Sequence, residues 1–112
     1  VGECMIELSN IEDRIFKMGF AGDTLNTAWY ARALLSDAWS VSFATKLGND
    51  ELSQNAVSFL TENNIGTDLI DYHPSRKIGI YLIQFTMWTI YLRFTDSLNV
   101  FTQSVIRKVA NL

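Results

Sequence analysis

The chain has 112 residues, 48% of them hydrophobic and 19% charged, which excludes a disordered or collagen-like chain and fits one domain. Nine lysines and arginines against twelve aspartates and glutamates give a net charge of −3, so no basic surplus favours nucleic acid as a partner. The single cysteine, Cys4, cannot form an internal disulfide, and with the single histidine, His73, it cannot build a zinc site.

The most apolar stretch, residues 78–92, is interrupted by Gln84, Thr86 and Thr89. It falls short of the roughly 20 apolar residues that a membrane span needs. The first residues lack the basic flank and cleavage site of a signal peptide. We therefore expect a cytoplasmic protein with no membrane partner.

Alternating residues predict a strand over Val1–Leu8, and residues 14–17 are compatible with a short exposed strand. Gly19–Asp23 is typical of a turn that leads directly into a helix. Either Asp23 or Thr24 is expected to cap the first turn of that helix.

Apolar residues at helical spacing continue this first helix to about Ser36. Trp39–Lys46 alternates again and predicts a second core strand, which Leu47–Asp50 ends. A second amphipathic helix is predicted from Glu51 until the Asn63–Gly66 segment closes it. Residues 68–72 then predict a third strand.

Residues 77–94 are rich in β-branched and aromatic side chains and predict two strands that meet near Thr86 and Met87. The last residues predict a short helix, with apolar side chains at Phe101, Val105, Val109 and Leu112. Strands that alternate with helices indicate an α/β fold with parallel pairing.

Chemically, Gly19–Asn26 is the most informative segment. Its two glycines allow a ligand to approach the backbone, and Asn26 on the first helical turn offers both a donor and an acceptor to a hydroxyl. The alternative is an ordinary strand-to-helix turn. His73 is expected to be a loop histidine rather than a catalytic base, and Cys4 a small core residue rather than a reactive thiol.

Several segments resemble, in order, the N-terminal part of ribokinase-like (PfkB) sugar kinases, in particular the 2-keto-3-deoxygluconate kinases. The segments are Gly2–Leu8 (GECMIEL), Gly19–Ala28 (GFAGDTLNTA), Ala44–Asp50 (ATKLGND), Asn64–Thr67 (NIGT) and Gly79–Leu82 (GIYL). The combination, in this order, of the glycine pair Gly19 and Gly22, Asn26 four residues later and a downstream Leu-Gly-x-Asp is specific, unlike any one of these pieces alone.

The resemblance implies part of a Rossmann-like ribokinase fold with a lid-type strand pair. It also implies ATP-dependent phosphorylation of a sugar-acid hydroxyl in the family's enzymes. Gly22 and Asn26 would lie at the sugar. Tyr81 matches the tyrosine of the family's Gly-x-Tyr strand, and Tyr91 and Arg93 match a Tyr-x-Arg on the partner strand, where the arginine would pair with a carboxylate. The alternatives are cross-strand packing for both tyrosines and a solvated edge charge for Arg93.

The family's Gly-Ala-Gly-Asp motif, which holds the catalytic base, does not occur in these 112 residues. We therefore expect residues 1–112 to be a single N-terminal fragment of a sugar kinase domain that carries only the acceptor-sugar half-site. Its lid elements would lie at about 9–18 and 77–94, and the family resemblance fades after about Gln84, so it implies no fold for 85–112. ATP and Mg²⁺ would serve the intact enzyme, and neither is expected to bind this fragment, which has no catalytic residue of its own.

The alternative function is a non-catalytic interaction or dimerisation module, or the product of a decayed gene. Trp88, Tyr91 and Phe94 would supply an apolar patch on the lid strands. On this alternative, the partner would be a second copy of the chain, and the homo-oligomer would form through these strands or through an unpaired sheet edge.

Overall fold

The computed structural model describes residues 1–85 and, as backbone, the strand at 90–94. Its elements are β1 (Met5–Glu12), β2 (Ile15–Ala21), α1 (Asp23–Leu34), β3 (Thr45–Gly48), α2 (Glu51–Glu62), β4 (Ile70–His73), β5 (Gly79–Phe85) and β6 (Ile90–Phe94). The predicted α/β class is confirmed. The predicted turn at Thr86, the apolar patch around Trp88 and the C-terminal helix fall outside the described residues.

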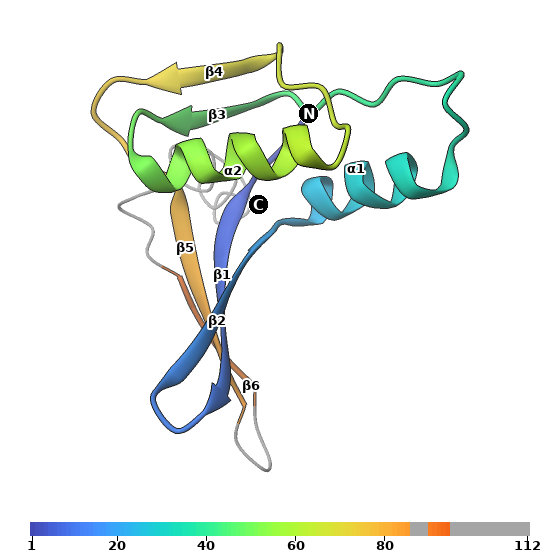
Figure 1. Ribbon diagram of the computed structural model, residues 1–112. Helices are drawn as coiled ribbons and strands as arrows, with labels where there is room; N and C mark the ends of the chain where they lie inside the picture. The colour runs from blue at the N-terminus through green and yellow to red at the C-terminus, as the bar shows by residue number, and fades with distance from the viewer. Residues whose placement is uncertain (86–89, 95–112) are drawn as a thin grey trace, which may run out of the picture.

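The strands form two sheets, one of four strands in the order β2-β1-β5-β6 and one of two strands, β3-β4. The parallel pairs are β1–β5 and β3–β4, and each is reached through a crossover that contains a helix. The pairs β1–β2 and β5–β6 are antiparallel. The four-stranded sheet extends from the two helices as a long twisted arm (Figure 1).

The hydrophobic core lies between the helices and the bases of both sheets. Each helix spans twelve residues, and neither is long and apolar enough to cross a membrane. Burying each large aliphatic side chain contributes about 1.5–3 kcal/mol. The buried members are Cys4, Ile6, Leu25, Ala28, Phe43, Leu47, Ala56, Leu60, Ile65 and Ile78.

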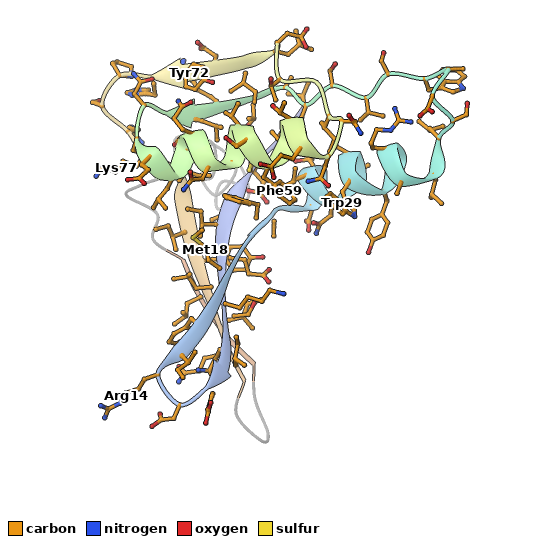
Figure 2. All side chains as sticks on the ribbon, in the orientation of Figure 1. Arg14, Met18, Trp29, Phe59, Tyr72 and Lys77 are labelled. Carbon is orange, nitrogen blue, oxygen red and sulfur yellow. The ribbon has the colours of Figure 1, made fainter. Side chains whose placement is uncertain are left out.

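The β1–β2 hairpin differs from the prediction at both ends. The strand predicted over Val1–Leu8 begins at Met5 and runs to Glu12, and residues 19–21, predicted as part of a turn, belong to β2. The polar end of β1 is paired with the exposed half of β2, so no buried face marks it in the sequence. Arg14 turns the chain at the hairpin tip with a left-handed φ of 60° (Figure 2).

The strand predicted over Trp39–Lys46 is shorter and later, at Thr45–Gly48. The Arg32 guanidinium donates to the carbonyl oxygens of Trp39 (2.6 Å), Leu35 (2.9 Å) and Ser36 (3.1 Å). Of these three acceptors, Trp39 alone belongs to the predicted strand. The middle of that segment forms a single parallel bridge, between Ser42 and Gly66, which does not continue as a strand. The third strand, predicted over residues 68–72, is observed at Ile70–His73, where it pairs with β3.

The predicted side-chain cap of α1 is wrong. The N-cap is Gly22, and no side chain caps the helix. The Thr24 hydroxyl donates instead to the Glu3 carbonyl oxygen (3.2 Å), which ties the first turn of α1 to the segment before β1.

The N-terminus of α2 is capped by Asp50, whose carboxylate accepts the Ser53 backbone N–H (3.2 Å) and hydroxyl (2.7 Å). Burial opposes ionisation, but hydrogen bonds from Ser53 and from the backbone, including Ile78, outweigh it and lower the pKa of Asp50. The native state therefore favours the ionised carboxylate. This contribution is complete above about pH 5 and is lost as the pH falls below about 4, through the folded-state pKa.

We expect urea unfolding to show this loss as a difference between the wild type and Asp50→Asn, which keeps a capping oxygen without the charge. Between about pH 6 and pH 3, the wild type should lose more unfolding free energy than the variant, by roughly 0.5 kcal/mol, because solvent screens the Asp50 charge. Identical pH dependence of the two proteins would contradict this role of Asp50.

Candidate functional site

A cleft of about 310 Å³ lies where β1 and β5 meet the first turn of α1. It is lined by Glu3, Met5, Gly22, Asp23, Asn26, Tyr81 and Ile83. Three of the residues predicted to bind a substrate, Gly22, Asn26 and Tyr81, thus border one cavity although Tyr81 is distant from the other two in sequence.

Gly22 lets the chain turn from β2 into α1 at the edge of the cleft. Its φ is 137°, a conformation that side-chain-bearing residues rarely adopt, and a Cβ there would lie 2.6 Å from the Glu3 carbonyl oxygen. The Gly22 carbonyl accepts the Asn26 N–H (2.8 Å), the first hydrogen bond of the helix. Asn26 is consequently one turn further along, on the helix face that borders the cleft.

Tyr81 reaches the cleft from β5, where it is the register partner of Glu7 on the parallel strand β1. The phenol donates a hydrogen bond to Glu7 Oε2, and the Ser9 hydroxyl donates to Glu7 Oε1 (2.8 Å). Burial, and then the bond to Glu7, raise the pKa of Tyr81, which keeps the phenol protonated. Glu7 was missed by the sequence reasoning because its only signal, an acid on the same strand face as Met5, is common on exposed strands.

Two acidic residues, Glu3 and Asp23, are among the residues that line the cleft. Burial, and secondarily the nearby Asp23, raise the pKa of Glu3. Neither acid was singled out in the sequence as a binding residue. Such a lining suits a ligand that donates several hydroxyl protons, with Met5 and Ile83 facing its carbon skeleton.

Tyr91 and Arg93 lie on β6, at the edge of the four-stranded sheet. Their register partners on β5 are Gln84 and Leu82, whereas Tyr81 is the partner of Phe94. The side chains of β6 lie outside the described part of the structure. The roles of Tyr91 and Arg93 therefore stay predictions.

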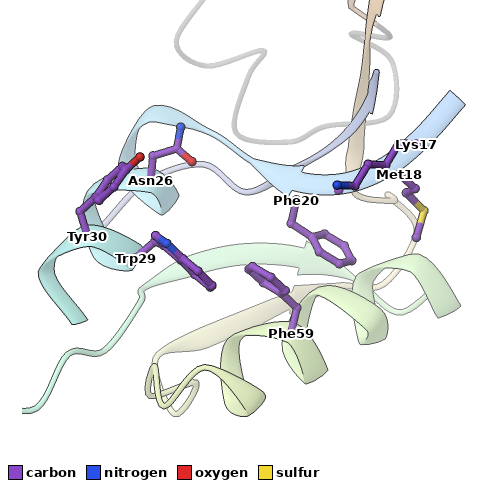
Figure 3. A pocket seen from close by; sticks show the side chains of 8 residues that line it. Lys17, Met18, Phe20, Asn26, Trp29, Tyr30 and Phe59 are labelled. Atoms are coloured by element: carbon purple, nitrogen blue, oxygen red, sulfur yellow. The ribbon is translucent and has the colours of Figure 1, made fainter. Parts of the chain in front are cut away.

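A second cavity, of about 530 Å³, lies between β2 and the two helices (Figure 3). Phe59 of α2 packs against Phe20 of β2, with ring centroids 5.1 Å apart, and lies nearly parallel to Trp29 of α1 at 5.5 Å. These rings hold the sheet against the helices. Asn26 borders this cavity as well as the first. The residues that line the second cavity are Lys17, Met18, Gly19, Phe20, Asn26, Trp29, Tyr30 and Phe59.

The two other candidates from the sequence, Cys4 and His73, have structural roles. Burial raises the pKa of the Cys4 thiol to about 12, so the thiolate that nucleophilic chemistry needs is not formed at neutral pH. His73 Nδ1 accepts the backbone N–H groups of Ser75 and Arg76 (3.2 Å each) and so stabilises the turn after β4. Within the part of the chain that the structure describes, no three His, Cys, Asp or Glu side chains are grouped to hold a metal.

Comparison with known proteins places this architecture in a family. The 2-dehydro-3-deoxygluconokinase of Dickeya dadantii is 40% identical over 85 residues, which are 75% of this chain and 27% of that protein. The crystal structure of 2-dehydro-3-deoxygluconokinase from Thermotoga maritima matches 83% of this chain and 30% of its own, with a TM-score of 0.69 and 26% identity.

A sugar kinase from Pyrococcus horikoshii, solved in complex with ATP, matches 87% of this chain and 33% of its own, with a TM-score of 0.78 and 24% identity. The chain thus spans about a quarter to a third of the length of these proteins. The family model described as pfkB family carbohydrate kinase matches residues 1–103. The chain therefore belongs to the pfkB family of carbohydrate kinases.

Proposed function

We propose that this chain carries the acceptor-sugar half-site of a kinase for 2-keto-3-deoxygluconate, also called 2-dehydro-3-deoxygluconate, or a related sugar acid. The observation that carries the proposal is the meeting of Gly22, Asn26 and Tyr81 in one cleft. The names of the relatives, which are 2-dehydro-3-deoxygluconokinases, support the substrate class. On this proposal, residues 1–112 correspond to the N-terminal part of the kinase domain.

Each proposed contact follows from the chemistry of its side chain. The Asn26 amide can donate to and accept from one ligand hydroxyl, and the missing side chain at Gly22 lets the ligand approach the backbone. Arg93, with Tyr91 beside the ligand, would pair with the sugar-acid carboxylate. A solvent-accessible ion pair of this kind would contribute about 1 kcal/mol and would weaken with salt.

These residues bind and orient a ligand, and none of them is assigned a catalytic role. Phosphoryl transfer requires a base for the attacking hydroxyl and a positioned nucleotide. In the family's reaction ATP with Mg²⁺ supplies the phosphoryl group, and we propose that neither binds to this chain. Half a site forgoes desolvation and preorganisation, so the expected affinity is about millimolar, or about 4 kcal/mol.

An NMR titration of the ¹⁵N-labelled chain with 2-keto-3-deoxygluconate tests the proposal. We expect saturable shifts at Gly22, Asn26 and Tyr81 that weaken at least about threefold in affinity in Asn26→Ala, because a hydrogen bond of about 1 kcal/mol is lost. Arg93→Ala should weaken binding similarly and reduce its salt dependence.

Asn49→Ala, at an exposed asparagine outside this cleft, is the matched control and should bind as the wild type does. Saturable shifts with ATP alone, and none with the sugar acid, would show that the chain is not the acceptor half.

A further inference from the structure

The Tyr81 phenol is held by a carboxylate that accepts hydrogen bonds on both of its oxygens. Glu7 Oε1 accepts the Ser9 hydroxyl at 2.8 Å, and Glu7 Oε2 accepts the Tyr81 hydroxyl. Glu7 and Ser9 are two residues apart on β1 and share one face of the sheet. Tyr81 is opposite Glu7 in the β1–β5 register, so the strand pairing itself fixes this contact.

A phenol carries one proton, which Tyr81 donates to Glu7. Toward a ligand its oxygen can then act only as an acceptor, and an acceptor pairs with a hydroxyl but not with a carboxylate. We propose that Glu7 is a positioning residue that fixes Tyr81 as a hydrogen-bond acceptor, so that the cleft takes the hydroxyl-bearing end of its ligand and excludes the carboxylate end. The identity of the ligand as a sugar acid rests on the proposed function.

Two acidic residues of the cleft act in the same direction. Glu3 and Asp23 line it, and their negative charges would repel a ligand carboxylate. Among the described lining residues, Asn26 is the one whose side chain carries N–H donors. Burial of Tyr81 raises its pKa, which keeps the proton on the phenol and the hydrogen bond to Glu7 intact at neutral pH. A sugar acid would consequently bind with its carboxylate pointing out of this cleft.

The hydrogen bond is tested without any ligand. In a chain labelled at tyrosine Cζ, the Tyr81 hydroxyl proton is assigned by its loss in Tyr81→Phe, and its exchange with water is measured by NMR. We expect exchange at least about tenfold slower in the wild type than in Glu7→Leu, which has a similar volume and no acceptor, because a charge-assisted hydrogen bond protects the proton.

Ser9→Ala is the matched control, because it removes the other partner of Glu7 and leaves the phenol contact intact. It should retain the slow exchange, and circular dichroism checks that every variant keeps the fold. Equal exchange rates in the wild type and Glu7→Leu would overturn the role of Glu7. A wild-type spectrum that shows no hydroxyl proton absent from Tyr81→Phe would do the same, because the Tyr81 proton would then not be protected.

Ligand selectivity is tested with two small probes. Erythritol, a neutral polyol, should shift the resonances of Tyr81 and Met5, and pyruvate, a keto acid without hydroxyls, should not. In Glu7→Leu the phenol proton becomes available to a carboxylate, so the preference for erythritol should fall at least about threefold, the equivalent of one weak hydrogen bond.

Equal shifts with both probes in the wild type would overturn the inference while leaving sugar-acid binding intact. If instead erythritol shifts the cleft and 2-keto-3-deoxygluconate does not, the hydroxyl-selecting role of Glu7 stands and the proposed function is wrong. The two failures are therefore distinguishable.

Discussion

Replacing Gly22 with alanine is expected to lower the free energy of unfolding by about 3 kcal/mol and to abolish ligand binding in the cleft. The φ of 137° disfavours any side chain, and the new Cβ would lie 2.6 Å from the Glu3 carbonyl oxygen, which is backbone. Relief requires moving either the start of α1 or the segment before β1. Urea unfolding and the sugar-acid titration measure the two effects.

Gly19→Ala is the matched control, because no atom lies within 4 Å of a Cβ built at Gly19. Its stability should stay within about 0.5 kcal/mol of the wild type. If Gly22→Ala is as stable as Gly19→Ala and binds the sugar acid normally, the turn at Gly22 does not shape the cleft.

Gly48→Ala should also cost about 3 kcal/mol, through overpacking rather than backbone strain. A Cβ at Gly48 would overlap the Arg76 carbonyl oxygen and lie 2.8 Å from Lys77 Cα. Both atoms belong to the backbone that leads into β5. The Gly48 N–H also donates to the buried Ser53 hydroxyl (3.1 Å), which joins the end of β3 to the first turn of α2.

The exposed neighbour Asn49 offers the control for this change, since Asn49→Ala should leave the unfolding free energy within about 0.5 kcal/mol of the wild type. This result would show that the Leu-Gly-x-Asp segment acts through close packing at Gly48 and capping by Asp50. A tolerated Gly48→Ala would contradict that explanation.

Both helices could be predicted from the sequence because local signals define them. Apolar residues recur at helical spacing, Gly22 precedes α1, and α2 begins after Asp50 and ends at Asn63–Asn64, where Asn64 adopts a left-handed φ of 56°. Gly22 and Asn26 belong to one turn, so their proximity was foreseeable. The family resemblance added Tyr81, which lines the same cleft.

Interactions between distant segments could not be predicted from local patterns. The contact of Tyr81 with Glu7 depends on the parallel register of β1 and β5. These strands are far apart in the sequence, and a local hydrophobic pattern does not indicate which residues of the two strands are paired. The strand predicted from Trp39 begins at Thr45, because the earlier residues pair through a single bridge to Gly66 and the Trp39 carbonyl oxygen accepts from Arg32, seven residues before it. The exposed half of the β1–β2 hairpin has no buried face, so its length was underestimated.

The central claim is that the Gly22–Asn26–Tyr81 cleft receives the hydroxyl-bearing end of a sugar acid. Intermolecular nuclear Overhauser effects between ¹³C-labelled 2-keto-3-deoxygluconate and the chain test it most directly. The account predicts contacts from the hydroxyl-bearing carbons to the Tyr81 ring and the Met5 methyl group. Contacts confined to the second cavity, at Phe59 and Trp29, or contacts to Tyr81 from the carboxylate end alone, would contradict it.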